Sequence, residues 1–376
     1  MNKKLKVMTV LGTRPEIIRL SEVIKKLDKY FNHTLVHTGQ NYDHELNQIF
    51  FHDLGLKKPD IFLEVSTSSA LESIGQIISK IEIHLDTIKP DAFLVLGDTN
   101  SCLAAIAAKK KKIPIFHMEA GNRCFDQRVP EETNRKIVDH ISDINLTYSD
   151  IARDYLLSEG MPPDRVIRTG SPISEVLQAH NTEISESTIL ETLSLTKFSY
   201  YLVSLHREEN VDSKENIQKI GELLNAISAK FNLPVLVSLH PRTKKSLTLN
   251  KVKLDKNILL HKPFGFIDYI ALQINSKATL SDSGTINEES SILNFPALNL
   301  RNAHERPEGM EEAAVMMTGL SLSKIMQGLK ILASQQRADS RTIYPVKDYS
   351  YNNVSEKIPR IILSYIDYVN SNLWKK

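Results

Sequence analysis

The feature that most constrains the fold of this chain is a regular alternation of short apolar runs with longer amphipathic stretches. Short β-branched runs bounded by polar residues are typical of buried strands, and apolar residues three or four apart are typical of helices. In the first half, the pattern predicts strands at 6–11, 33–37, 92–96, 113–117 and 144–147. It predicts helices at 15–29, 71–88, 102–109, 131–141 and 151–158. Such alternation is typical of a parallel sheet covered on both faces.

The alternation stops at a connector and then starts again. Residues 160–188 contain Gly-Pro and polar stretches that are typical of a linker. Beyond them, the pattern predicts strands at 200–205, 234–238, 257–260, 278–281 and 296–300. It predicts helices at 214–231, 266–275, 287–293, 322–333 and 354–370. Because 376 residues are too many for one ordinary core, we predict an α/β chain of two doubly wound Rossmann-like domains, 1–170 and 171–353.

The spacing of the glycines excludes two common nucleotide-binding motifs. None of the 14 glycines lies two or five residues before another, so neither G-x-G-x-x-G nor the P-loop can occur. A conventional NAD enzyme and a P-loop kinase are therefore not expected. The chain has no Asp-x-Asp pair, and its two cysteines, Cys102 and Cys124, lack the spacing of a zinc site. We expect no cofactor and no bound metal.

Charge and hydropathy narrow the choice of partners. A net charge of +2 is too balanced for a protein that binds duplex nucleic acid. No apolar run approaches the roughly 20 residues that a membrane span needs. The apolar run Val7–Leu11 is short and charged residues follow it, so a first strand fits better than a signal peptide. Two cysteines without paired spacing suit a reducing compartment. The sequence predicts a cytoplasmic protein with no nucleic-acid partner and no membrane insertion.

Seven polar clusters stand where a predicted strand ends or a predicted helix begins. They are residues 12–16, 97–100, 117–123, 130–135, 204–210, 281–285 and 301–308. Any one of them alone could be an ordinary loop or helix cap. Together they predict one cleft between the two domains, because ligands of doubly wound sheets bind outside the carboxyl ends of the strands. Helix N-termini and arginines in these clusters indicate an anionic, diphosphate-like ligand.

At these clusters the chain resembles the non-hydrolysing UDP-N-acetylglucosamine 2-epimerases. The matching strings, in family order, are Gly-Thr-Arg-Pro-Glu (12–16), His-Thr-Gly-Gln (37–40), Gly-Asp-Thr (97–99), His-Met-Glu-Ala-Gly (117–121), Pro-Glu-Glu-Thr-Asn-Arg (130–135), Ser-Asp-Ser-Gly (281–284) and Glu-Arg-Pro-Glu (305–308). The resemblance covers nearly the whole chain. It implies a GT-B fold, with UDP between the two domains and the terminal helix, 354–376, packing back on the first domain. It also implies a homodimer.

The resemblance assigns roles residue by residue. It implies catalytic roles for Asp98, Glu119, Glu131 and His206. It implies that the UDP-sugar is bound by Arg14, Arg19, Arg135, Phe264, Tyr269, Ser283, Gly284, Thr285, Glu289 and Arg306. The chain departs from the family at Thr285, where a second glycine is usual, and at Arg19, where a lysine is usual. An arginine keeps the charge but changes the geometry of its hydrogen bonds. Phe264 replaces a residue that is polar in many members.

The chemistry of a C2 inversion favours elimination of UDP. The C2 proton of a pyranose is not beside a carbonyl group, so direct deprotonation is too difficult. Transient oxidation of the sugar would need a redox cofactor, and the glycine motif that binds such a cofactor is missing. Elimination through a 2-acetamidoglycal needs cations on the departing diphosphate and acid/base groups on both faces of C2. The candidate cations are Arg14, Arg19, His206 and Arg306. The candidate acids are Asp98, Glu119 and Glu131, and which acid serves which face is left open.

The sugar is predicted from three further strings. Residues 117–128, 204–210 and 283–291 resemble the branch that makes UDP-N-acetyl-L-fucosamine from UDP-2-acetamido-2,6-dideoxy-L-talose for capsule or O-antigen polysaccharide. This substrate has a C6 methyl group, for which Phe125 is the candidate contact, although a core phenylalanine is an equally good interpretation. One alternative is a UDP-N-acetyl-D-glucosamine/UDP-N-acetyl-D-mannosamine 2-epimerase. An alternative from another class is a GT-B glycosyltransferase that transfers from a UDP-sugar donor to an acceptor.

Overall fold

The chain forms two compact units and passes from one to the other twice. The computed structural model describes residues 4–39, 44–65, 69–205, 207, 210, 213–239 and 241–376. The first unit consists of Met1–Ala179 with Asp348–Lys376, and the second of His180–Lys347. The first unit therefore also includes residues 171–179 and 348–353, which the sequence assigned to the second domain. The physical reason is that α7 (Ile173–Ala179) packs on α1 (Arg14–Tyr30), while Asp348 binds Arg168 at 2.9 Å.

The first unit is built on a seven-stranded sheet that is parallel throughout. Its strands are β1 (Lys6–Leu11), β2 (Asn32–His37), β3 (Ile61–Phe62), β4 (Ala92–Leu96), β5 (Ile115–Ala120), β6 (Ile144–Thr147) and β7 (Val166–Arg168). Their order is β3-β2-β1-β4-β5-β6-β7. The order reverses between β1 and β4, and ligands of doubly wound sheets bind at such a switch point.

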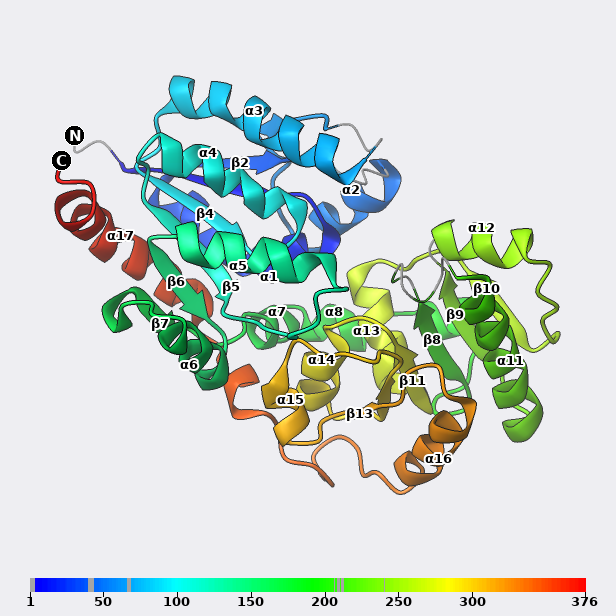
Figure 1. Cartoon of the computed structure of the whole chain (residues 1–376). Helices are drawn as coiled ribbons and strands as arrows, with labels where there is room; N and C mark the ends of the chain where they lie inside the picture. The colour runs from blue at the N-terminus through cyan, green and yellow to red at the C-terminus, as the bar shows by residue number, and fades with distance from the viewer. Residues whose placement is uncertain are drawn as a thin grey trace. The chain divides into compact units, whose positions relative to one another are not determined.

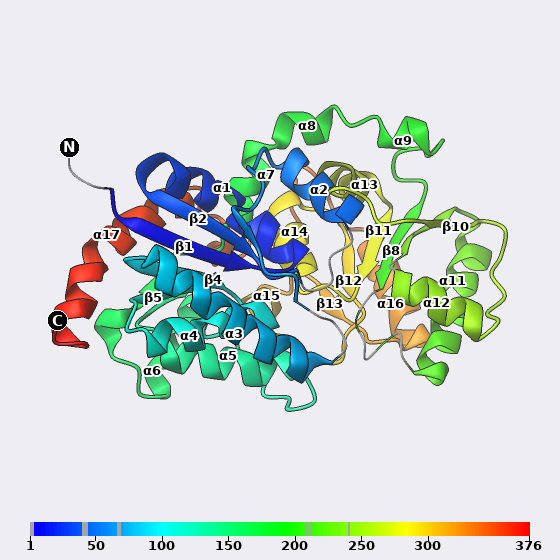
Figure 2. The ribbon, with the colours of Figure 1, turned by 90° about the horizontal axis from the view of Figure 1, so that it is seen from above.

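Helices cover both faces of this first sheet (Figures 1 and 2). One face carries α1, α7 and α17 (Val354–Asn372), and the other carries α3 (Ala70–Ile88), α4 (Ala105–Lys110) and α5 (Pro130–Ile141). The unit also contains α2 (His44–Asp53) and α6 (Asp150–Ser158). The last helix lies along α1, where Lys26 pairs with Glu356. The core beneath α3 joins Ile77, Ile81 and other residues of that helix to alternate strand residues.

The second unit repeats this architecture with six parallel strands. They are β8 (Tyr201–Leu205), β9 (Val235–Leu239), β10 (Ile258–His261), β11 (Ala278–Ser281), β12 (Ala297–Asn299) and β13 (Met316–Met317), in the order β10-β9-β8-β11-β12-β13. Its helices are α8 (Asn181–Ser185), α9 (Ile189–Thr192), α11 (Lys214–Phe231), α12 (Pro241–Leu249), α13 (Phe266–Asn275), α14 (Ile286–Leu293), α15 (Pro307–Glu311) and α16 (Leu322–Leu332). Here the order reverses between β8 and β11.

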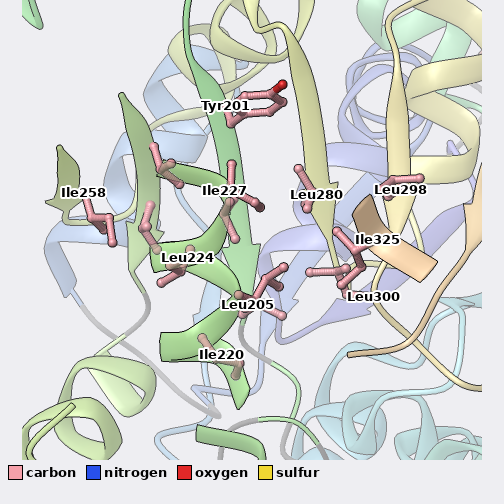
Figure 3. Packing of buried hydrophobic residues seen from close by; sticks show 14 of the residues in the cluster. Tyr201, Leu205, Ile220, Leu224, Ile227, Ile258, Leu280, Leu298, Leu300 and Ile325 are labelled. Atoms are coloured by element: carbon pink, nitrogen blue, oxygen red, sulfur yellow. The ribbon is translucent and has the colours of Figure 1, made fainter. Parts of the chain in front are cut away.

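One face of the second sheet packs against α11 and α16 (Figure 3). Leu224 and Ile227 of α11 are fully buried against alternate residues of β8 and β9. Ile325 of α16 is buried against Leu298 and Leu300, at and just beyond the end of β12. Full burial of one such side chain contributes about 1.5–3 kcal/mol, so this layer makes β8 and β11 a rigid base for the loops that follow them.

The predicted fold class is confirmed, because both units are doubly wound parallel α/β structures. The helix expected at 102–109 is instead a 3-10 turn, Asn100–Ala104, followed by the short α4. Ser101 in this turn donates to the Glu16 carboxylate, which holds the chain close to α1, and the Cys102 thiol donates to the backbone oxygen of Leu96. Within the described residues, no helix is both long enough and apolar enough to cross a membrane.

Candidate active site

The backbone at Glu119 is strained at the carboxyl end of β5. Glu119 has a φ of 63°, and the pairing of β5 with β6 shifts register between Met118 and Ala120. A left-handed conformation costs a residue with a Cβ roughly 1–2 kcal/mol. Lys89 and Asn232 also have positive φ, but they are ordinary helix C-caps, whereas Glu119 lies inside a strand. Strain of this kind at a strand end is typical of a functional position.

The Glu119 side chain is buried in an ion pair. Its Oε2 lies 2.5 Å from Nη1 of Arg19, and its Oε1 accepts a hydrogen bond from Nδ2 of Asn122 at 3.1 Å. Only 6% of the Glu119 side chain and 5% of the Arg19 side chain are exposed. A neighbouring guanidinium favours the charged form of a carboxylate. Gly97 adds no side chain here, and a Cβ on it would lie only 3.5 Å from Oε2 of Glu119.

Glu16 ties the turn after β1 to the turn after β4. Its carboxylate accepts hydrogen bonds from the backbone of Gly12 at 3.0 Å and Thr13 at 2.7 Å. It also accepts from the hydroxyls of Ser101 at 2.5 Å and Thr99 at 3.1 Å. Burial raises the pKa of Glu16, and the hydrogen bonds from Ser101 and Thr13 oppose this increase. Glu16 was not among the predicted site residues, although its spacing from Thr13 is that of a capping box.

Asp98 and Arg135 come together at the entrance to α5. Oδ2 of Asp98 accepts from Nη2 of Arg135 at 2.8 Å and from its Nε at 3.1 Å. Nη1 of Arg135 donates to Oε2 of Glu132 at 2.9 Å. Asn134 completes the contact by donating to the backbone oxygen of Asp98 at 3.0 Å. Asp98 therefore lies at the end of β4 with its carboxylate fixed by a nearly buried arginine.

The two acids at the start of α5 are in different environments. Glu131 is partly exposed, whereas the Glu132 side chain is fully buried. Glu132 accepts from the backbone of Cys124 at 3.1 Å and of Phe125 at 3.3 Å. Burial alone would raise the pKa of Glu132, but the hydrogen bonds from Cys124 and the charge of Arg135 hold it below its ordinary value. Glu132 anchors the loop after Glu119, whereas the Glu131 side chain remains partly accessible.

Arg14 and Phe125 of the first unit each lie against an aromatic ring. The guanidinium of Arg14 lies 5.8 Å from the ring centroid of Phe50, at the start of α1. Phe125 is 65% exposed and packs edge-on against Tyr155, with 5.3 Å between the ring centroids. The interpretation of Phe125 as a core residue is therefore wrong, because its side chain lies on an exposed loop.

The turn after β11 in the second unit is formed by small hydroxyl residues. The backbone N–H of Ser283 donates to the Ser281 hydroxyl at 3.1 Å, and the hydroxyls of Ser283 and Thr285 lie 2.9 Å apart. Helix α14 begins directly after Thr285. A Cβ on Gly284 would lie 3.8 Å from Nε of Arg306. Backbone N–H groups at a helix start, beside an arginine, form a natural site for phosphate oxygens.

Buried charged and hydroxyl groups support this turn. Arg306 is 4% exposed, and its Nη1 lies 3.3 Å from Oε2 of the fully buried Glu288. Tyr269 makes side-chain hydrogen bonds with Ser204 and Ser281, which lie on β8 and β11. Burial first and the charge of Glu289 second raise the pKa of Tyr269, so its phenol stays neutral. These contacts link the two central strands of the second sheet at their carboxyl ends.

The remaining predicted residues of the second unit lie in different places. Glu289 lies beside this group, since its charge acts on Tyr269, and it accepts from Nε2 of Gln273 at 2.7 Å. Phe264 is buried and stacks on His261, with 4.2 Å between ring centroids, beyond the end of β10. The predicted His206 lies outside the described residues. Among the residues that the structure describes, no three His, Cys, Asp or Glu side chains are grouped so that they could hold a metal ion.

Comparison with known proteins identifies the family. A family model described as UDP-N-acetylglucosamine 2-epimerase matches residues 25–363. The chain belongs to the UDP-N-acetylglucosamine 2-epimerase family. It is therefore an isomerase of nucleotide sugars, and the glycosyltransferase alternative is not supported. The family resemblance seen in the sequence is confirmed.

Related proteins match the epimerase over nearly its whole length. A UDP-N-acetylglucosamine 2-epimerase structure from Rickettsia bellii is 49% identical, with a TM-score of 0.91 over 99% of this chain and 100% of that one. The Methanocaldococcus jannaschii UDP-GlcNAc 2-epimerase, solved in complex with UDP-GlcNAc and UDP, is 34% identical, with a TM-score of 0.89 over 96% and 100%. A UDP-2,3-diacetamido-2,3-dideoxy-D-glucuronate 2-epimerase from Pseudomonas aeruginosa is 32% identical over 90% of this chain and 96% of its own length. The two Rossmann-like units of this epimerase are thus those of GT-B-like structures.

Proposed function

We propose that the chain is a non-hydrolysing UDP-N-acetylhexosamine 2-epimerase that eliminates UDP and adds it back. The observation that carries the proposal is the buried Arg19–Glu119 pair at a strained strand end. A carboxylate that is oriented by an arginine at the carboxyl end of β5 suits a base for the C2 proton. Asp98, at the end of the neighbouring β4, and the accessible Glu131 supply further acids.

The reaction proceeds in two balanced halves. The C1–O bond breaks and its electron pair leaves with UDP, while a carboxylate takes the C2 proton and the C–H pair forms the C1=C2 double bond. The 2-acetamidoglycal then adds UDP back at C1 and receives a proton at C2 from the opposite face. Glu119 is our candidate for one face, and Asp98 or Glu131 for the other.

The second unit is our candidate for holding UDP. The Ser283–Thr285 turn offers N–H and hydroxyl donors at the start of α14, and Arg306 lies beside Gly284. Fixed donors and a cation at this point stabilise the negative charge that develops on the departing diphosphate. Arg14, Arg135, Phe264, Tyr269, Glu289 and His206 complete the proposed substrate-binding and catalytic set. A solved relative that is 34% identical to this chain is described in complex with UDP-GlcNAc and UDP, which supports a UDP-sugar as the ligand of this set.

For the sugar, we propose UDP-2-acetamido-2,6-dideoxy-L-talose, converted to UDP-N-acetyl-L-fucosamine for capsule or O-antigen polysaccharide. The support is the resemblance of residues 117–128, 204–210 and 283–291 to that branch. The family includes members named for different sugars, such as the diacetamido-glucuronate 2-epimerase. An apolar pocket rejects an added hydroxyl by only about 10²-fold, so the ring configuration must contribute to strong selectivity. The homodimer and the cytoplasmic location stay predictions.

The test is exchange at C2 in deuterated water. The protein is incubated with the 6-deoxy-L-talo substrate or with UDP-N-acetyl-D-glucosamine, and deuterium at C2 is followed by NMR. We expect exchange and epimer with the first substrate and a much lower kcat/KM with the second. Comparable values would remove the L-talo assignment and leave the general family activity. No exchange with any UDP-N-acetylhexosamine would overturn the proposed epimerisation itself.

Elimination is tested separately with an oxygen label. A substrate with ¹⁸O between C1 and the β-phosphorus should move this label into a non-bridging position, because the β-phosphate rotates once the C1–O bond is broken. Retention of the label in the bridge during epimerisation would show that UDP never leaves, and the elimination route would be wrong.

A further inference from the structure

A buried carboxylate behind the proposed base has no place in the reaction as described so far. Asp139 lies on α5, and its side chain is fully buried. The sequence did not single it out, because an acid inside a predicted helix looks like an ordinary surface residue. The structure surrounds it with groups from the turn that contains Glu119.

Asp139 contacts the chain on both sides of Glu119. The backbone N–H of Gly121 donates to its two oxygens, at 3.2 and 3.3 Å. Nδ1 of His117 lies 2.9 Å from Oδ1. His117 and Gly121 stand two residues before and two residues after Glu119. One carboxylate therefore spans the strained residue.

The contacts on both sides of Glu119 extend to the neighbouring strand, β4. Nε2 of His117 donates to the backbone oxygen of Gly97 at 2.7 Å, and Gly97 in turn donates to the backbone oxygen of Met118 at 2.9 Å. Gly121 itself has no room for a side chain, since a Cβ on it would lie 2.3 Å from the backbone oxygen of Ala152. The ends of β4 and β5 are thus joined through His117 and Gly97, and Asp139 lies against the His117 ring.

The negative charge of Asp139 is balanced by Arg123. Nη1 of Arg123 donates to Oδ2 of Asp139 at 2.6 Å, and its Nε and Nη2 donate to both oxygens of Glu159, at 2.8 and 2.6 Å. The side chains of Arg123, His117 and Asp139 are fully buried, whereas 29% of the Glu159 side chain is exposed. Buried networks of this kind hold one geometry because any displacement leaves a charge or donor unpaired.

We propose that Asp139 is a positioning residue that maintains the left-handed conformation of Glu119 and so aims its carboxylate at C2 of the sugar. This inference rests on the proposed function, because it assigns Glu119 to proton transfer. Asp139 acts only through Glu119 and has no part in binding UDP. Loss of the contacts that Asp139 makes with His117 and Gly121 should let the turn at Glu119 relax. A small misplacement of a reacting group can lower the rate by about 10²-fold.

The test compares Asp139→Asn with a matched control in the same network. Asn keeps the shape and one acceptor but loses the charge and cannot accept through both atoms. We expect kcat to fall by roughly 30-fold, with KM for the UDP-sugar within about threefold. The primary isotope effect on kcat with substrate deuterated at C2 should rise, because proton transfer becomes the slow step. Glu159→Gln, at the far side of Arg123, should leave kcat and the isotope effect within about twofold of the wild type.

Each outcome decides the proposal. The proposal is wrong if Asp139→Asn has a normal kcat. It is also wrong if the variant mainly raises KM, or if its kcat falls while the isotope effect stays unchanged. If Asp139→Asn does not fold, His117→Gln decides, since the amide can still donate to Gly97 but no longer reaches Asp139. His117→Gln should then lower kcat and raise the isotope effect in the same way, and normal values overturn the proposal. If the wild-type protein catalyses no C2 exchange on any UDP-N-acetylhexosamine, the proposed function is wrong, and so is the role proposed for Asp139.

Discussion

The two units have sheets with the same strand order around their switch points but carry different chemistry there. In the first unit the strand ends are joined by acids and arginines with buried side chains, and the backbone at Glu119 is strained. In the second, the turn Ser283–Thr285 is formed by small hydroxyl residues at a helix start. The difference teaches that one unit is built to orient charged side chains, and the other to present backbone donors. On our proposal the first performs proton transfer and the second holds UDP.

The sharpest way to break this comparison is Glu119→Gln. The change keeps the volume of the side chain and removes the base, so we expect kcat to fall by about 10³-fold or more. The affinity for UDP, measured by calorimetry, should change by less than about threefold, because UDP is assigned to the other unit. Strong residual turnover would take Glu119 out of the mechanism. A large loss of UDP affinity would show that the division of labour is wrong.

The counterpart in the second unit is Arg306→Ala. Removing a charge-assisted hydrogen bond should raise KM for the UDP-sugar by about 100-fold, with a smaller effect on kcat. Arg306→Lys keeps the charge that balances Glu288 and should recover part of the loss. A thermal melt of both variants separates a binding effect from unfolding. An unchanged KM in a folded Arg306→Ala protein would remove this arginine from the UDP site.

The first unit should become less stable as the pH falls, because it contains the buried His37. Burial lowers the pKa of His37 to about 4, and its Nδ1 accepts from the backbone N–H of Gly39 at 2.9 Å. The unfolded chain binds a proton near pH 6.5, above the folded pKa, so the free energy of unfolding decreases as the pH falls from 6.5 towards 4. Between pH 7 and pH 5 the loss is about 2 kcal/mol. Hydrogen exchange of β2 and β1 across this range measures it.

His37→Asn is the matched variant for this measurement. Its side-chain oxygen can replace Nδ1 as the acceptor for Gly39, but the amide does not titrate in this range. The pH dependence of exchange in the first unit should become shallower by the amount assigned to His37. An identical slope in the variant would mean that other groups cause the acid sensitivity.

The smallest effect is expected for Tyr269→Phe. The variant loses the hydrogen bonds to Ser204 and Ser281 but keeps the ring, so KM for the UDP-sugar should rise by about fivefold. We expect kcat to change by less than about twofold, since the phenol supports the UDP turn and lies outside the proposed proton-transfer groups. A large fall in kcat with a constant KM would place Tyr269 in the chemical step instead.

The sequence predicted the long elements well because their patterns are local. The strand 92–96 and the helix 214–231 have the predicted bounds. The two-residue strands β3 and β13 were missed. A run of two residues is too short to show the alternation of apolar and polar residues, and only its pairing with a neighbouring strand identifies it. The helix expected at 102–109 was displaced by contacts with Glu16, which lies far away in sequence.

The site was predictable only where residue type and position in a motif suffice. Motifs pointed to Glu119 and Arg19 but not to their ion pair, because the pair joins α1 to β5. They did not separate the accessible Glu131 from the buried Glu132, since both suit the first turn of a helix. Asp139 was missed because its contacts are with His117, Gly121 and Arg123. Only the folded chain brings these residues close to it.

The double crossing of the chain has a consequence for biosynthesis. The second unit is one continuous stretch, His180–Lys347, whereas the first is completed only when α17 returns to lie on α1. On the ribosome, the later-made unit can therefore close its core while the earlier-made one still waits for its last helix. Translation would finish the two units in the reverse of their order along the messenger RNA, with α17 as the final piece to dock.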